Sequence, residues 1–174
     1  MNDVLQFFSR SADKYPGCGV GEHVADPTKY KRLSKIKNWR RMFSDLWEED
    51  FKFEGKTYRT QQHALQAAKF TSAGYNDIAF QFCVESGSKL ALGCGLDAMR
   101  ARKKVMLSED EMAVWNEVRP TRKTAIYAAK YCGGNTASEA LVATMDAILV
   151  SNGPRLHRIV CERLMQAREH LQNL

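Results

Sequence analysis

Apolar and polar positions alternate in some segments of this chain and follow a helical period in others. The pattern predicts short strands over Val4 to Phe8 and over Ala147 to Val150. Alternation from Phe51 to Tyr58 predicts a small hairpin that turns at Glu54-Gly55. The segment from Ser11 to Asp26 contains a proline and several glycines, so we expect a loop there.

The helical period accounts for most of the remaining chain. Thr60 suits an N-cap, and Ser108 with Glu111 forms a capping-box signature that opens another helix. We expect Pro120 to break that helix and Gly153-Pro154 to turn the chain into the last one. The helical segments predicted are Lys31 to Arg41 in part, Thr60 to Phe70, Asn76 to Ser86, Ser108 onward, Thr124 to Tyr131, Ala140 to Thr144, and Leu156 to Leu171 with Ile159 and Val160 facing inward. The pattern therefore predicts a predominantly helical α+β fold with a small β-sheet, as a single domain over residues 1–174.

Composition narrows the class of protein. At 174 residues, with 44% hydrophobic and 26% charged residues, the chain suits one soluble globular domain. No apolar run reaches the ~20 residues of a membrane span, and the N-terminal segment lacks a basic-then-apolar signal pattern. Five cysteines without a CxxC motif indicate reduced thiols and a cytoplasmic or nuclear location. Four scattered histidines show no ligand spacing, so we expect no metal and no cofactor.

Charge changes the picture more than composition does. The net charge is +6, and much of the excess lies in the basic run Lys29 to Arg41, which also contains Tyr30 and Trp39. Such a run attracts phosphate-rich ligands through charge and through stacking on aromatic rings. A solvated basic face beside a core tryptophan is the alternative, and the sequence leaves both open.

One helix has a polar line that suggests chemistry. Gln62, Gln66 and Lys69 fall at i, i+4 and i+7, so their side chains share one face. Ala64 and Ala67 are small enough for neighbouring helices to approach closely. This face is either an ordinary wet surface or the wall of a site, in which case Lys69 is the residue that matters.

Three longer blocks resemble a known family. The blocks are FFSRSADKYPGCGVGE (Phe7 to Glu22), LSKIKNWRRMFSDLW (Leu33 to Trp47) and GKTYRTQQHALQAAKF (Gly55 to Phe70). They are similar, in order, to the segments FYSKS…PG.G.GE, L..I..WR..LSNFW and GK.Y..VEHAYQAAKF of the NADAR domain family, a group related to the bacterial riboflavin-pathway N-glycosidase. Weaker matches follow at Lys123 to Tyr131, Leu141 to Val150 and Leu164 to Glu169, and the opening and ending look most like the eukaryotic and large-virus branch.

The resemblance implies cleavage of an N-glycosidic bond between ribose and an amino-bearing base. The substrate it favours is ADP-ribose attached to the guanine amino group of nucleic acid or nucleoside, with ADP-ribose as product and no membrane partner. A ribosylamino-pyrimidine phosphate is the alternative substrate. A module that binds ADP-ribose without turnover is the alternative of another class.

Within that chemistry Lys69 is expected to attack the anomeric carbon and form a Schiff base with the sugar, which requires a lowered amine pKa. Glu22 or Asp146 would move the proton. Gln62 stands where the family has glutamate, and Asp45 where it has asparagine. Because a glutamine cannot act as a general base, Glu22 and Asp45 are the carboxylates that would replace it.

The remaining site predictions concern ligand contacts. Basic side chains and a glycine-bearing loop would bind phosphates, and Trp47 would stack on a ring or lie in the core. His63 either orients the site or has a structural role. The predicted ligand-binding residues are Ser9, Arg10, Gly21, Lys37, Arg40, Ser44, Asp45, Trp47, His63 and Gln66, beside the predicted catalytic residues Lys69, Glu22, Gln62 and Asp146.

Overall fold

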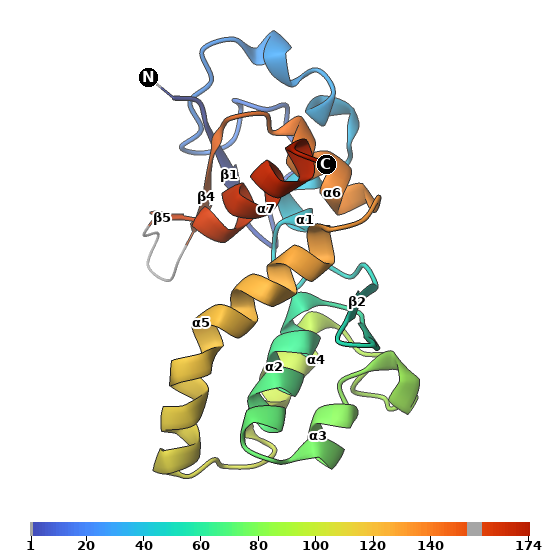
Figure 1. Ribbon diagram of the computed structural model, residues 1–174. Helices are drawn as coiled ribbons and strands as arrows, with labels where there is room; N and C mark the ends of the chain where they lie inside the picture. Colours follow the sequence, from blue (N-terminus) through green and yellow to red (C-terminus); the bar gives the residue numbers. More distant parts are fainter. Residues whose placement is uncertain (1, 153–157) are drawn as a thin grey trace. The chain divides into compact units, whose positions relative to one another are not determined.

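The computed structural model describes residues 2–152 and 158–174 (Figure 1). The chain forms two compact units, each of which is described by itself. The first unit consists of Met1–Ser44 and Tyr131–Leu174, and the second of Asp45–Lys130. The fold is α+β and predominantly helical with small sheets, which confirms the predicted class. The single-domain organisation over residues 1–174 stays a prediction.

A three-stranded sheet organises the first unit. Its strands are β1 (Val4–Phe7), β4 (Ile148–Asn152) and β5 (Arg158–Val160), in the order β1-β4-β5. The pair β1 and β4 is parallel, with Leu5 opposite Leu149, and both side chains are fully buried. Parallel strands need a long crossover, and here the chain between them supplies it. The strand β5 then pairs with β4 in antiparallel orientation.

Helices cover the sheet of the first unit. They are the 3-10 turns η1 (Pro27–Tyr30) and η2 (Leu33–Lys35) and the helices α1 (Trp39–Met42), α6 (Thr136–Ala143) and α7 (Glu162–Gln172). The helix α1 packs on β1 and α6, and α7 packs on β4 and α6. Phe43 anchors this core, with its ring centroid 5.9 Å from that of Phe7 and 5.9 Å from that of Trp39. Burial of such large rings is a main stabilising contribution in a small core.

The second unit is a helical cluster with one hairpin. Its elements are β2 (Phe51–Phe53), β3 (Lys56–Tyr58), α2 (Gln61–Ser72), α3 (Asn76–Phe80), η3 (Val84–Ser86), α4 (Gly95–Arg100), η4 (Ala101–Lys103) and the long α5 (Glu109–Tyr131), whose last residue belongs to the first unit. The small residues of α2 let α3 and α4 pack closely against it. Phe70 and Phe82 stack in the core with centroids 5.8 Å apart.

Local signals at three helix and turn boundaries are confirmed. The Thr60 side chain accepts a hydrogen bond from the backbone N–H of His63 and so caps α2. Ser108 and Glu111 make the reciprocal pair of a capping box before α5. The hairpin turns at Glu54 and Gly55, both in the left-handed region with φ of 49° and 76°.

Four predictions about element boundaries are wrong. Pro120 does not break α5, because Trp115 and Ile126 on either side of it are held in one core and compensate for the hydrogen bond that proline lacks. The last helix begins at Glu162. Ile159 and Val160, predicted to face inward on that helix, lie instead in β5 and are about half exposed, since β-branched residues suit a strand that pairs with β4.

The two other differences are of the same kind. The helix expected over Asn76 to Ser86 is divided into α3 and η3. The helix expected from Ala140 begins earlier, at Thr136, because the Asn135 side chain accepts a hydrogen bond from Ser138 and caps it. The turn predicted at residues 153–154 lies outside the described residues.

Candidate functional site

Lys69 lies near the C-terminal end of α2 in the second unit and is half-buried. Its amine nitrogen is 5.7 Å from the centroid of the Phe70 ring. Within the part of the chain that the structure describes, this amine has neither a hydrogen bond nor an ion pair. Burial lowers the pKa of Lys69, and the positive charges of Arg102 and Arg119 lower it further. Both effects favour the neutral, nucleophilic form of the amine.

The polar line along α2 forms as predicted and has one unused acceptor. The Gln66 amide donates to the Gln62 side-chain oxygen at 3.3 Å, as the i, i+4 spacing requires. Gln66 is only 8% exposed, and its own side-chain oxygen has no partner among the described residues. A buried oxygen without a partner is costly unless a water molecule or a ligand occupies it.

The segment Asp45 to Trp47 is tied to α2 and α5 within the second unit. The Asp45 backbone carbonyl accepts a hydrogen bond from the Gln62 backbone N–H at 3.1 Å. The two residues that differ from the family segments therefore lie side by side. The Asp45 carboxylate accepts from the Tyr127 hydroxyl at 2.6 Å and lies 3.3 Å from the Lys123 amine. These contacts hold the Asp45 side chain in place.

Trp47 is held by its backbone and leaves its indole nitrogen unused. The Lys130 amine donates to the Trp47 carbonyl at 3.1 Å. The indole N–H of Trp47 is buried and has no partner among the described residues. An unused donor on Trp47 and an unused acceptor on Gln66 therefore occur in the same unit as the Lys69 amine.

His63 is engaged within the protein. Its Nε2 lies 3.0 Å from the Leu90 carbonyl and its Nδ1 2.8 Å from the Thr60 hydroxyl. Because a carbonyl only accepts, Nε2 bears the proton and Nδ1 accepts from the hydroxyl. Burial lowers the pKa of His63, which keeps the ring neutral. A ligand contact by His63 stays a prediction, and it would require one of these hydrogen bonds to break.

Sequence reasoning missed three basic residues of the second unit. Arg102 and Arg119 act electrostatically on Lys69, and Lys130 is completely buried, with its pKa lowered by burial to about 8. The run RARKK over residues 100–104 was a visible charge signal for Arg102. No charge pattern marks Arg119, since isolated basic residues on a long amphipathic helix are usually solvated. Lys130 lies in the segment Lys123 to Tyr131 that resembles the family, but the resemblance gives it no role.

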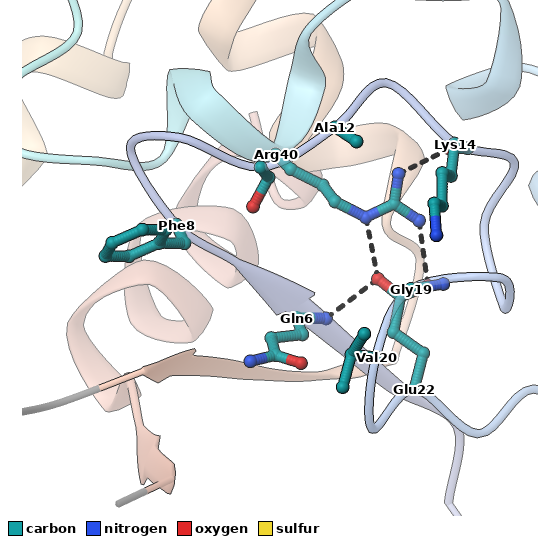
Figure 2. A pocket seen from close by; sticks show the side chains of 9 residues that line it. Gln6, Phe8, Ala12, Lys14, Gly19, Val20, Glu22 and Arg40 are labelled. Carbon is teal, nitrogen blue, oxygen red and sulfur yellow. Dashed lines mark hydrogen bonds and ion pairs between the residues drawn. The ribbon is translucent and has the colours of Figure 1, made fainter. Parts of the chain in front are cut away.

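In the first unit the Glu22 side chain is completely buried and accepts five hydrogen bonds. Figure 2 shows this side chain beside Arg40 and Gln6. One carboxylate oxygen accepts from the Gln6 backbone at 3.1 Å and from Arg40 Nε at 2.8 Å. The other accepts from the backbone of Gly17 and Gly19, each at 2.9 Å, and from a terminal Arg40 nitrogen at 2.8 Å. Burial alone raises the pKa of Glu22, but the hydrogen bonds from Arg40 and Gln6 outweigh burial and lower it.

The hydrogen-bond donors of Arg40 are nearly all engaged, as the acceptors of Glu22 are. It also donates to the carbonyls of Lys14 and Tyr15, and its guanidinium carbon lies 4.1 Å from the centroid of the Trp39 ring. Four of the five donors of this arginine are therefore engaged. The pair fastens the loop to β1 and α1. Proton transfer by Glu22 and phosphate binding by Arg40 stay predictions, and each would have to break this arrangement.

The other predicted residues of the first unit are spread over its surface. Asp146 is exposed and pairs with the Lys29 amine at 2.5 Å, a hydrogen bond that lowers the pKa of Asp146. Gly21 has a φ of 78°, and a Cβ at this position would meet the Arg158 guanidinium. Arg10 and Lys37 are exposed, whereas Ser9 and Ser44 are half-buried. The structure thus joins Glu22 to Arg40, and it pairs Asp146 with Lys29.

The described residues contain neither a metal-binding cluster nor a helix that could span a membrane. Across 2–152 and 158–174, no three histidine, cysteine or acidic side chains gather in a way that would hold a metal ion. In the same ranges no helix has the length and apolar character needed to cross a membrane.

Comparison with solved structures gives one informative match. The chain is similar to the NMR structure of the Escherichia coli protein YbiA, with a TM-score of 0.55 and 19% sequence identity. The match covers 99% of this chain and 88% of that one. No protein-family model matches the chain, and no curated protein does. The likeness to YbiA establishes that the fold is NADAR-like.

Proposed function

We propose that this protein is an N-glycosidase that removes ADP-ribose from the amino group of guanine, with Lys69 as the nucleophile. The observation that supports the proposal most directly is the state of the Lys69 amine. It is half-buried, has no hydrogen bond or ion pair among the described residues, and its pKa is lowered by burial and then by Arg102 and Arg119. The NADAR-like fold is consistent with a glycosidase.

The proposed reaction proceeds by exchange of one amine for another. The glycosylamine opens its ribose ring to give an imine between C1 and the guanine nitrogen. Neutral Lys69 adds to C1, and the bond from C1 to the guanine nitrogen breaks as that nitrogen takes up a proton. The lysine–sugar Schiff base that remains is hydrolysed by water, which releases ADP-ribose and regenerates the amine.

A side chain has to give a proton to the leaving guanine nitrogen, and a carboxyl group can do so only if one of its oxygens is free to carry that proton. Glu22 already uses both carboxylate oxygens for five hydrogen bonds, so it suits this role least. Asp146 is exposed and has one strong partner, and Asp45 has the Tyr127 hydroxyl at 2.6 Å. Asp45 also lies in the same unit as Lys69, so we place it first among the proton-transfer candidates.

A polyanionic substrate fits the charge around Lys69. Arg102 and Arg119 have no acidic partner among the described residues, and Lys103 and Lys104 beside Arg102 are exposed. Cations of this kind attract phosphates, and nucleic acid supplies many of them. This favours an ADP-ribosylated guanine in a strand over a small ribosylamino-pyrimidine phosphate.

Gln62 supports a second candidate, a module that binds ADP-ribose without cleaving it. Gln62 stands where the family has glutamate, and its side-chain oxygen accepts from Gln66. An amide cannot replace a carboxylate as a base. The two candidates differ in whether ligand is released as product.

The decisive experiment incubates the protein with an oligonucleotide that contains ADP-ribosyl-guanosine. We expect free ADP-ribose to accumulate, and borohydride added during turnover to trap a sugar on Lys69, located by peptide mass spectrometry. Lys69→Ala should abolish trapping while binding persists. Lys52→Ala, which removes an exposed lysine of β2 in the same unit, is the matched control and should turn over normally.

Each result points to one candidate. Tight binding without release by the unaltered protein would favour the module. Full turnover by Lys69→Ala would refute the Schiff-base route. Release from a ribosylamino-pyrimidine phosphate, but not from the oligonucleotide, would replace the substrate.

A further inference from the structure

A small pocket opens on the first unit above the Glu22–Arg40 pair (Figure 2). Its volume is about 200 Å³. Sites for whole ligands usually measure about 300–1,000 Å³, so this pocket has room for one ring of a larger molecule. Its wall is built mainly from apolar atoms, with few polar groups.

The floor of the pocket is rigid because its charges are already paired. Glu22 is completely buried and Arg40 is 4% exposed, and they bind each other and the loop backbone. No charge at the floor is left over for a ligand to neutralise. Recognition therefore depends on the neutral groups and on the rim.

Gln6 and Ser11 are the neutral polar residues of the wall, and Gln6 has the larger polar group. It lies on β1, where its backbone N–H donates to Glu22, and the residue is only 9% exposed. Its side-chain amide has no partner among the described residues. The amide offers one donor and one acceptor side by side, and an amino-bearing nucleobase presents the complementary pair. The Gln6 amide can therefore bind the edge of a ligand that enters the pocket.

The rim adds an aromatic face and a charge. Phe8 lies two residues after Gln6, lines the pocket and is 43% exposed, so one part of its ring is open to a ligand. Lys14 is exposed at the opposite rim, and its amine has no acidic partner in the described part of the chain. An aromatic face suits stacking on a base, and an ammonium suits a phosphate.

We propose that this pocket binds the adenine of an adenine nucleotide, with Gln6 bonded to the edge of the base, Phe8 against its face and Lys14 near its phosphate. An adenine nucleotide is one half of ADP-ribose, so the biological ligand named here rests on the proposed function. The contacts themselves belong to the first unit alone, and they can be tested without any turnover.

The test measures binding by NMR chemical-shift titration of the whole protein with three probes. The probes are adenosine monophosphate, purine riboside 5′-monophosphate, which lacks only the amino group, and ribose 5-phosphate, which lacks the base. We expect adenosine monophosphate to bind about tenfold more tightly than purine riboside monophosphate, because the amino group donates to the Gln6 oxygen. Ribose 5-phosphate should bind most weakly.

Variants assign the contacts. Gln6→Met keeps the side-chain volume and the backbone hydrogen bond to Glu22, and it should erase the difference between the two purine probes. Gln81→Met, the same change at an exposed glutamine of the second unit, is the control. Phe8→Leu should weaken both purine probes alike. Lys14→Gln should weaken the monophosphate but leave adenosine unchanged.

The outcomes separate this inference from the proposed function. Absence of saturable adenosine monophosphate binding, or an unchanged preference in Gln6→Met, would overturn the pocket assignment even if turnover occurs. Binding by Lys69→Ala with wild-type affinity supports the pocket, because the pocket does not need that amine. Nucleotide binding in a protein that never releases ADP-ribose would keep the pocket and refute the glycosidase.

Discussion

Arg40 in the first unit and Lys69 in the second are both basic side chains that the fold removes at least partly from water, but they differ in the partners that surround them. Arg40 is 4% exposed and has a carboxylate, two carbonyls and an aromatic ring around it. Lys69 has a ring nearby and two further positive charges. The partners of Arg40 stabilise its charge, whereas burial and the neighbouring positive charges favour the neutral form of Lys69.

The residue types suit these two roles. Arginine stays protonated and presents a rigid fork of donors, so it can hold a carboxylate and two carbonyls at once. Lysine loses its proton readily when it is desolvated, and only the neutral amine attacks carbon. The comparison predicts that changes at Arg40 or its partner alter stability, while changes at Lys69 alter chemistry.

The largest effect is expected at Lys69 itself. Lys69→Arg keeps a positive charge but cannot supply a neutral amine, so single-turnover release of ADP-ribose should fall at least about 10³-fold, as for loss of other nucleophiles. The urea midpoint should move little, because the side chain is only half-buried. A clearly lower urea midpoint for Lys69→Arg, or retained turnover, would refute the prediction that Lys69 serves the reaction and not the stability of the fold.

The next effect concerns the stability of the first unit. Glu22→Gln should lower the free energy of unfolding by about 3 kcal/mol, because it leaves Arg40 buried without its counter-charge. Glu48→Gln removes the carboxylate of an exposed pair with Arg59 and should cost less than about 1 kcal/mol. Urea titrations of both variants give the measurement.

Acid provides the same test without mutation. The folded pKa of Glu22 lies below its ordinary value. Its contribution is therefore fully present above the ordinary pKa and is lost as pH falls through the folded pKa. The stability of Glu22→Gln should depend less on pH in that acidic range than the stability of the unaltered protein.

A third effect sharpens the comparison at Lys130, the other desolvated lysine. Burial lowers its pKa from 10.5 to about 8, although Glu49 and Asp45 act in the opposite direction. Between those values the unfolded chain binds a proton that the folded protein lacks, so the free energy of unfolding should rise with pH, by up to about 3 kcal/mol. Lys130→Met should lack this rise. Exposed Lys52→Met should retain it, and a flat profile in the unaltered protein would refute the shift.

The smallest effect concerns the charges around Lys69. Arg102→Gln with Arg119→Gln should move the pH profile of turnover to higher pH but should not restore that of an exposed lysine, because burial, the main cause of the lowered Lys69 pKa, remains. Turnover of an oligonucleotide should also become less sensitive to salt. If neither the pH profile of turnover nor its dependence on salt changes, these arginines neither lower the pKa of Lys69 nor bind the substrate. Lys89→Gln, an exposed charge elsewhere in the second unit, is the control.

Helix caps and turns that depend on neighbouring residues could be predicted from the sequence alone. Thr60, the pair Ser108 and Glu111, and the turn at Glu54 and Gly55 all act on backbone groups a few positions away. Pro120 was misjudged because the outcome depends on Trp115 and Ile126, whose packing partners are distant in the chain. The strand β5 was missed for the same reason, since its pairing partner is β4.

The candidate site shows the same division. The i, i+4, i+7 line of Gln62, Gln66 and Lys69 follows from helical geometry, so the sequence by itself determined that these side chains share a face. Only the tertiary structure decided which charges have partners. Glu22 and Arg40 are separated by 18 positions in sequence and bind each other, whereas the charges of Arg102 and Arg119 lower the pKa of Lys69. Burial and charge neighbours come from packing between distant segments, and they determine whether a basic residue is held in an ion pair or has its neutral form favoured.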